Sequence, residues 1–187
     1  MLLNSKIFGT GNKTLVVLHG FLGMLDNWKT FAKKMVGNDY KIHLLDQRNH
    51  GKSFHNNEFN YKIMAKDLHN YITYHNIKKF SLIGHSMGGK TAMMFSSLFP
   101  EFIDKMIVVD ILPIYYENDY STILNILKSL DLEKLKTRSE IDKALENDFK
   151  EASFRSFLLK NLDRIDKDKL GFKIDLDIII DNLSEVE

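Results

Sequence analysis

The segment Gly84-His85-Ser86-Met87-Gly88-Gly89 constrains the fold of this chain more than any other feature. It follows an apolar run at residues 80–83 that predicts a strand, and it leads into residues 87–99, whose apolar side chains recur at helical spacing. A chain that turns from strand to helix so quickly has no room for side chains on either side of its tip. The segment therefore predicts a tight strand-turn-helix unit with Ser86 at the turn.

This turn also makes Ser86 the candidate nucleophile. Gly84 and Gly88 stand two residues before and two residues after the serine, where the turn requires the smallest side chains. Ser86 would lie at the amino end of a helix, whose N–H groups favour a developing negative charge. We expect the N–H of Met87 to be one donor to such an oxyanion. The alternative explanation is a glycine-rich turn without chemistry.

A second segment, His19-Gly20-Phe21-Leu22-Gly23, follows the uninterrupted apolar run at residues 15–18. In a strand-turn-helix site of this kind, the loop after an earlier strand supplies the other oxyanion donor. We expect the backbone N–H of Phe21 to be that donor, with His19 and Gly20 holding the shape of the loop. By itself the segment would also fit an ordinary glycine turn at the end of a strand.

Short β-branched runs alternate with longer stretches of helical spacing in the first part of the chain. This alternation is typical of an α/β fold with a mostly parallel sheet flanked by helices. Asp26 or Asn27 is expected to cap the first helix. The pattern predicts strands at residues 15–18, 41–45, 80–83 and 105–112, the last of them buried, and helices at residues 28–36, 61–75 and 87–99.

The character of the sequence changes after Pro113, where strand-like runs give way to helical spacing. Residues 1–113 carry a net charge of +6 and residues 114–187 one of −5. We predict two segments, a core at 1–113 and a helical segment at 114–187, although a solvated acidic helical face would explain the charge equally well. Residues 175–180 fit either a strand or a partly buried helix end.

Composition excludes several classes of protein. The 187 residues are 44% hydrophobic, which is enough for a packed core, and the net charge of +1 gives no reason to expect nucleic acid or an acidic membrane as partner. There is no cysteine, no His/Asp cluster with metal-ligand spacing and no secretory signal, so we expect a cytoplasmic protein without metal or cofactor. The longest apolar runs are too short to span a membrane.

The motifs resemble those of the α/β-hydrolase superfamily, and within it the small serine esterases of the YbfF type. The resemblance covers about residues 5–115. It rests on residues 19–28 (HGFLGMLDNW), 46–53 (DQRNHGKS), 84–90 (GHSMGGK) and 109–113 (VDILP), of which Arg48-Asn49-His50-Gly51 is the most discriminating. The helical remainder resembles the start of a cap, which implies that the last strands and helices of the fold are absent from this chain.

The resemblance implies a Ser, Asp, His triad in that order along the chain. Asp110 matches the acid position, where it would orient the histidine, although a strand-end carboxylate that accepts backbone N–H bonds is the alternative. All seven histidines precede or adjoin Ser86. We therefore expect the catalytic histidine beyond Glu187, and of the seven only His50 is a weak substitute.

The predicted function is a serine hydrolase that cleaves carboxylic esters or thioesters of small to medium acyl groups through an acyl-enzyme. Its partner would be a small-molecule ester or thioester, and the chain would be inactive without the missing histidine. The alternatives are a non-catalytic binding protein that keeps the turn, and another reaction on the same fold, such as C–C hydrolysis or perhydrolysis.

Overall fold

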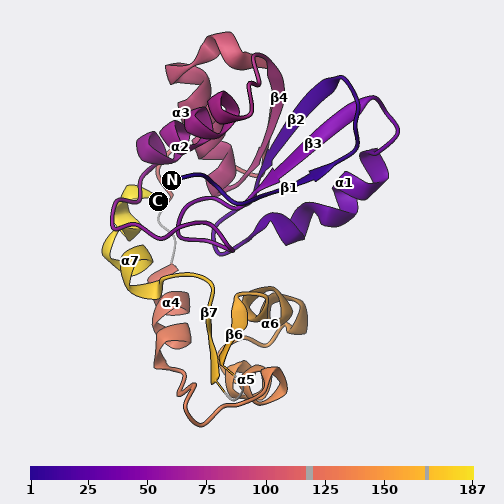
Figure 1. Cartoon of the computed structure of the whole chain (residues 1–187). Coiled ribbons are helices and arrows are strands. Elements are labelled where there is room, and N and C mark those ends of the chain that lie inside the picture. The colour runs from indigo at the N-terminus through magenta and orange to yellow at the C-terminus, as the bar shows by residue number, and fades with distance from the viewer. Residues whose placement is uncertain (117–119, 167–168) are drawn as a thin grey trace.

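Five strands form one mixed sheet in the computed structural model, which describes residues 1–116, 120–166 and 169–187 (Figure 1). β1 is antiparallel to β3, and the other neighbouring strands are parallel. The carboxyl ends of β2, β3, β4 and β5 therefore lie at one edge of the sheet, where ligand sites form in such folds. The strands are β1 (Ser5–Phe8), β2 (Lys13–Leu18), β3 (Tyr40–Leu45), β4 (Phe80–His85) and β5 (Ile103–Val109), in the spatial order β1-β3-β2-β4-β5.

Helices cover both faces of this sheet. Side chains alternate along β2, so Leu15 and Val17 pack on the face of η1 (Leu25–Trp28) and α1 (Lys29–Met35). Val16 and Leu18 pack on the opposite face, under α2 (Tyr61–Tyr74) and α3 (Met87–Leu98). The predicted α/β class, a mostly parallel sheet flanked by helices, is confirmed.

The later part of the chain lies across the carboxyl ends of the strands (Figure 1), and we call its described residues from 120 onward the cap segment. Its apolar side chains share one buried cluster with Phe21, Leu22 and Met87 of the core. The cap segment is thus seated directly on the two motifs that the sequence singled out. Its elements are α4 (Tyr120–Ser129), α5 (Arg138–Leu145), α6 (Ala152–Leu159), β6 (Leu162–Asp166), β7 (Lys169–Phe172), α7 (Leu176–Asp181) and the 3-10 turn η3 (Leu183–Glu185).

The prediction that strands disappear after Pro113 was wrong. β6 and β7 form an antiparallel hairpin in the cap segment, with Leu162 and Leu170 buried. Charged residues fill most of the remaining positions of the two strands and leave too few apolar residues for a visible alternation. The undecided run at 175–180 is a helix, α7, whose first turn is capped by the Asp175 carboxylate accepting from the N–H of Ile178 at 3.1 Å.

Three further predictions need correction. β5 ends at Val109 rather than residue 112, because Asp110 adopts a left-handed φ of 58° that breaks the extended chain. β5 is an edge strand among the described residues, and it is largely exposed rather than buried, with Ile107 at 55%.

The short strand β1 was not predicted, because it left no signal in the sequence. Neither Asp26 nor Asn27 caps α1; the 3-10 turn η1 precedes it, and Asn27 accepts a hydrogen bond from the N–H of Met24 at 2.8 Å instead.

No helix among the described residues is long and apolar enough to cross a lipid bilayer.

Candidate active site

Ser86 occupies a strained turn between β4 and α3. Its φ and ψ are 50° and −119°, outside the regions that residues with a side chain favour. A Cβ at Gly84 would lie 2.2 Å from the carbonyl oxygen of Gly88, and a Cβ at Gly88 would lie 2.6 Å from that of His19. Both contacts are with backbone, so the turn has no room for side chains at either position.

Backbone hydrogen bonds hold the turn in this conformation. The N–H of Ser86 donates to the carbonyl of Val109 at the end of β5, at 2.9 Å. The carbonyl of Ser86 accepts from the N–H groups of Gly89 at 2.7 Å and Lys90 at 3.1 Å. Met87 is the first residue of α3, so its N–H has no acceptor within the helix. Among the described residues, the N–H of Met87 beside the serine therefore has no acceptor.

The structure brings Ser86, Met87 and Phe21 together around one narrow crevice of about 10 Å³. The crevice lies between the loop after β2 and the start of α3. No described residue accepts a hydrogen bond from the N–H of Phe21. The two residues that the sequence predicted to supply the oxyanion donors therefore line the same crevice as the serine.

His19 is buried and holds the loop that carries Phe21. Its Nε2 accepts from the N–H of Gln47 at 3.0 Å, so Nδ1 carries the hydrogen and donates to the carbonyl of Gly20 at 2.8 Å. Burial lowers the pKa of His19 to about 4. The ring is therefore neutral at physiological pH, and both of its nitrogens are engaged in the loop.

Two more buried side chains brace the same loop at Leu22, whose φ is 55°. His50 Nε2 accepts from the N–H of Leu22 at 3.3 Å, and its Nδ1 donates to the carbonyl of Arg48 at 3.0 Å. Burial lowers the pKa of His50 to about 3. Asn161 of the cap segment donates to the carbonyl of Leu22 at 2.8 Å. With both nitrogens in use, His50 is not available as a base in this geometry.

The residues around Arg48 form a rigid loop after β3. The carboxylate of Asp46 accepts from the N–H groups of Leu25 at 2.7 Å and Lys52 at 2.9 Å. Arg48 is buried and makes a two-pronged ion pair with Asp67 of α2, at 2.5 and 2.8 Å. Asp46 and Arg48 of the DQRNHGKS string thus hold the loop after β3, from which His50 reaches the N–H of Leu22.

Asp110 lies at the end of β5, on the same edge of the sheet as Ser86. Its side chain is 86% exposed, and its carboxylate lies 3.9 Å from Nε2 of His85. Asp110 does not line the crevice at Ser86. The structure thus places the predicted acid near the serine but leaves its carboxylate facing solvent.

Three residues at the site were not predicted from the sequence. Tyr120, the first residue of α4, contacts the Ser86 side chain through a hydrogen bond, and burial, the larger effect, raises the pKa of its hydroxyl. The hydroxyl of Tyr61 donates to the carbonyl of Val186 at 2.5 Å, and Nζ of Lys90 donates to that of Glu187 at 2.8 Å. Lys90 lies in the GHSMGGK motif, which was a reason to examine it. Tyr61 and Tyr120 lie in no motif noted in the sequence.

In the part of the chain that the structure describes, no histidine ring nitrogen hydrogen-bonds to Ser86, and no three His, Asp or Glu side chains gather in a way that could hold a metal ion. The described residues at the site are therefore Ser86, with Phe21 and Met87 at the same crevice, and Asp110 on the same edge of the sheet.

Comparison with known proteins identifies the family. Residues 13–160 match the model of the α/β hydrolase fold family, and the chain belongs to that family. It is 34% identical to the esterase YbfF of Escherichia coli over 151 residues, and 34% identical to the sn-1-specific diacylglycerol lipase ABHD11 of Danio rerio over 186 residues. These alignments cover 80% and 95% of this chain.

A solved structure of a marine microorganism esterase superimposes with a TM-score of 0.95 at 37% identity, covering 99% of this chain and 73% of the esterase. The chain spans 59% of the length of YbfF and 58% of that of the Danio rerio lipase. The resemblance seen in the sequence motifs is thus confirmed at the level of family and fold.

Proposed function

We propose that this chain carries the nucleophile, the oxyanion donors and the acid of a serine hydrolase that cleaves carboxylic esters or thioesters of small to medium acyl groups. The observation that carries the proposal is the strained Ser86, which lines the same crevice as Phe21 and Met87. Relatives named as esterase and lipase support this class of substrate.

In the proposed reaction Ser86 Oγ attacks the carbonyl carbon and gives its proton to a histidine base. The carbonyl oxygen becomes an oxyanion held by Phe21 N–H and Met87 N–H. The intermediate collapses to an acyl-enzyme as the histidine protonates the departing alcohol or thiol. Water, deprotonated by the same histidine, then attacks the acyl-enzyme, releasing the carboxylic acid and restoring the Ser86 hydroxyl.

The base in this proposal is a histidine outside residues 1–187. His19 and His50 are the buried histidines nearest the loop of Phe21, and the ring nitrogens of both are engaged in hydrogen bonds. Asp110 would orient the incoming histidine and stabilise its charged form. Its exposed carboxylate at the edge of β5 is open to such a partner.

The nucleophile is tested by labelling with a fluorophosphonate and by hydrolysis of p-nitrophenyl acetate. Both are measured for the 187-residue chain and for a chain extended past Glu187 to the length of the relatives. We expect labelling and turnover only in the extended chain, and Ser86→Ala should abolish both. Ser97→Ala, at an exposed position of the same helix α3, is the matched control and should retain both.

Three results would contradict this assignment. Turnover by the 187-residue chain would show that its base is already present. Labelling that survives Ser86→Ala would show that another residue is the nucleophile, and an extended, folded chain without any labelling would favour a non-catalytic binding protein.

Asp110→Asn should lower kcat of the extended chain by on the order of a thousandfold or more, with little change in KM, because the acid acts by orienting the histidine. Asp104→Asn, an exposed position on the same strand β5, is the control and should leave kcat unchanged. Equal rates for Asp110→Asn and the unsubstituted chain would move the acid role to another residue.

A further inference from the structure

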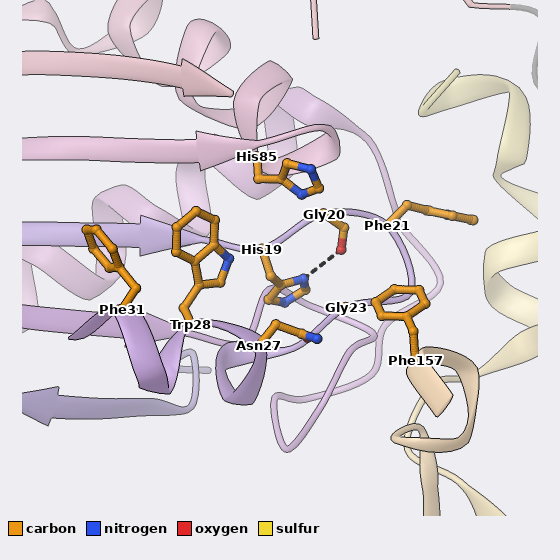
Figure 2. Close-up of a pocket in the computed structure, with 9 residues that line it drawn as sticks. All are labelled: His19, Gly20, Phe21, Gly23, Asn27, Trp28, Phe31, His85 and Phe157. Carbon is orange, nitrogen blue, oxygen red and sulfur yellow. Dashed lines mark hydrogen bonds between the residues drawn. The ribbon is translucent and has the colours of Figure 1, made fainter. Parts of the chain in front are cut away.

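The cavity shown in Figure 2, of about 370 Å³, shares Phe21 with the crevice at Ser86 and belongs to the site described above. A second cavity, of about 250 Å³, shares no lining residue with either of them. It lies where the carboxyl end of β3 meets the amino end of β1. We call it the lysine pocket, because four lysines line it, namely Lys6, Lys29, Lys52 and Lys173.

The four lysines of this pocket come from parts of the chain that are far apart in sequence. In chain order they lie in β1, at the start of α1, in the loop after β3 and, in the cap segment, directly after β7. The fold, rather than a basic run in the sequence, therefore brings these charges to one place. Like charges that are brought together destabilise the folded chain, and an anion bound between them removes that cost.

Two aspartates also line the lysine pocket, and both carboxylates are already engaged. Asp26 forms an ion pair with Lys29 at 2.5 Å. The buried carboxylate of Asp46 accepts hydrogen bonds from three N–H donors, at 2.7, 2.7 and 2.9 Å, and so holds the loop after β3. The charge of one lysine is thus compensated, and the charges of the other three are not.

Lys6, Lys52 and Lys173 form no ion pair with any carboxylate among the described residues. The ammonium of Lys173 donates to the carbonyl of Lys160 at 3.1 Å, and that of Lys6 lies 5.6 Å from the centre of the Phe8 ring. A carbonyl and an aromatic ring carry no net charge, so both lysines keep theirs. A cleft lined by uncompensated charge of one sign concentrates ions of the other sign. The pocket therefore favours an anion.

Size and charge narrow the class of anion. The volume of the pocket lies just below the range of drug-sized sites, which favours a ligand of few atoms. A phosphate group presents three charged oxygens, and a lysine ammonium binds such oxygens as a compact charge with three donors. Three ammonium groups from different elements thus match the terminal oxygens of a phosphate monoester. A carboxylate offers only two oxygens and a single charge.

We propose that the lysine pocket binds the dianionic phosphate group of a small phosphate monoester between Lys6, Lys52 and Lys173. Lys173 belongs to the cap segment and the other two lysines belong to the core, so the bound anion ties the cap segment to the core. The pocket is independent of the nucleophile, because none of its lining residues lines the crevice at Ser86.

Calorimetric titration of the 187-residue chain with methyl phosphate, at pH 7.5 and constant ionic strength, tests the pocket. We expect saturable binding at a single site, for which inorganic phosphate competes. Methyl sulfate has the same shape but carries one charge fewer, so it should bind about tenfold more weakly. Absence of saturable binding, or equal affinity for the two methyl esters, would overturn the proposal.

Single lysine variants locate the binding. Lys52→Gln and Lys173→Gln should each weaken methyl phosphate binding about tenfold, because each removes one charge-assisted contact, whereas Lys52→Arg keeps the charge and should keep most of the affinity. Lys33→Gln removes the same charge from an exposed position of α1 outside the pocket and should leave the affinity unchanged. An equal loss in Lys33→Gln, or unaltered affinity in Lys52→Gln or Lys173→Gln, would refute the assignment.

The tie between the cap segment and the core has its own readout. Methyl phosphate should slow amide hydrogen exchange at residues 170–174 in the unsubstituted chain and not in Lys173→Gln. Exchange there that does not respond to the ligand would refute the tie. Ser86→Ala should bind methyl phosphate with unchanged affinity, since the pocket does not include the nucleophile, and a large loss in that variant would move the ligand to the crevice and overturn the proposal.

Discussion

Mild acid should destabilise this fold through the buried imidazoles of His19, His43 and His50. Each is at most 1% exposed. Burial lowers their pKa values from 6.5 to about 4, about 4 and about 3. His43 shows the cause most plainly: its Nδ1 bonds to the hydroxyl of Tyr71 at 2.9 Å, and its Nε2 has no hydrogen-bond partner among the described residues.

The direction in which stability changes with pH depends on whether the folded or the unfolded state binds the proton more tightly. Above pH 6.5 the rings are neutral in both states, so they do not affect stability. Below pH 6.5 the unfolded chain takes up protons that the folded chain refuses, and stability falls until the pH reaches the folded pKa values near 4 and 3. At pH 5 each ring costs about 2 kcal/mol, at about 1.4 kcal/mol for each pH unit below 6.5. The three together cost about 6 kcal/mol, as much as the whole stability of many domains.

Urea unfolding at pH 7.5 and pH 5.0, followed by far-ultraviolet circular dichroism, measures this difference. His50→Gln should reduce the loss between the two pH values by about 2 kcal/mol, whatever it does to stability at pH 7.5. Ile42→Val, a truncation at a fully buried position beside His43, is the control: it should cost about 1 kcal/mol at both pH values and leave the difference unchanged. A pH difference equally large in His50→Gln and the unsubstituted chain would refute the reasoning.

Three further substitutions test other contacts by chemical denaturation. Gly88→Ala should lower the free energy of unfolding by about 3 kcal/mol or more, because its Cβ would lie 2.6 Å from a main-chain oxygen; a neutral result would contradict the turn geometry. Arg48→Met should cost about 3–5 kcal/mol by leaving the Asp67 carboxylate buried and unpaired, and adding Asp67→Leu should recover most of that loss; no recovery would show that the ion pair is not the cause. Asn161→Ala should cost about 1–3 kcal/mol and speed hydrogen exchange in residues 20–23, whereas Asn38→Ala, on the surface, should do neither; unchanged exchange would show that Asn161 does not brace the loop.

Much of the core could be predicted from the sequence because two-sided burial leaves a strong pattern. β2 reads as an unbroken apolar run because α1 covers one face and α2 and α3 cover the other. The strand-turn-helix at Ser86 was equally visible, since its geometry excludes side chains at two fixed positions.

The misses have a physical cause as well. β1 and the β6–β7 hairpin are short and partly exposed, so neither carries a long apolar pattern of its own. The end of β5 depends on one dihedral angle at Asp110, which the identity of the residue permits but does not require. The contact of Tyr120 with Ser86 and of Asn161 with Leu22 joins residues far apart in sequence, and no local pattern encodes such pairs.

The left-handed conformation of Ser86 sets folding against chemistry at a single position. Conformations of this kind cost of order 1–3 kcal/mol in a residue with a side chain, and glycine avoids most of that cost. A chain optimised only to fold would have glycine at position 86, and the hydroxyl needed for nucleophilic attack would be lost. Serine at this position is therefore a trade-off between stability and chemistry. Hydrogen bonds with Val109, Gly89 and Lys90 hold the residue in a conformation that it would not adopt by itself.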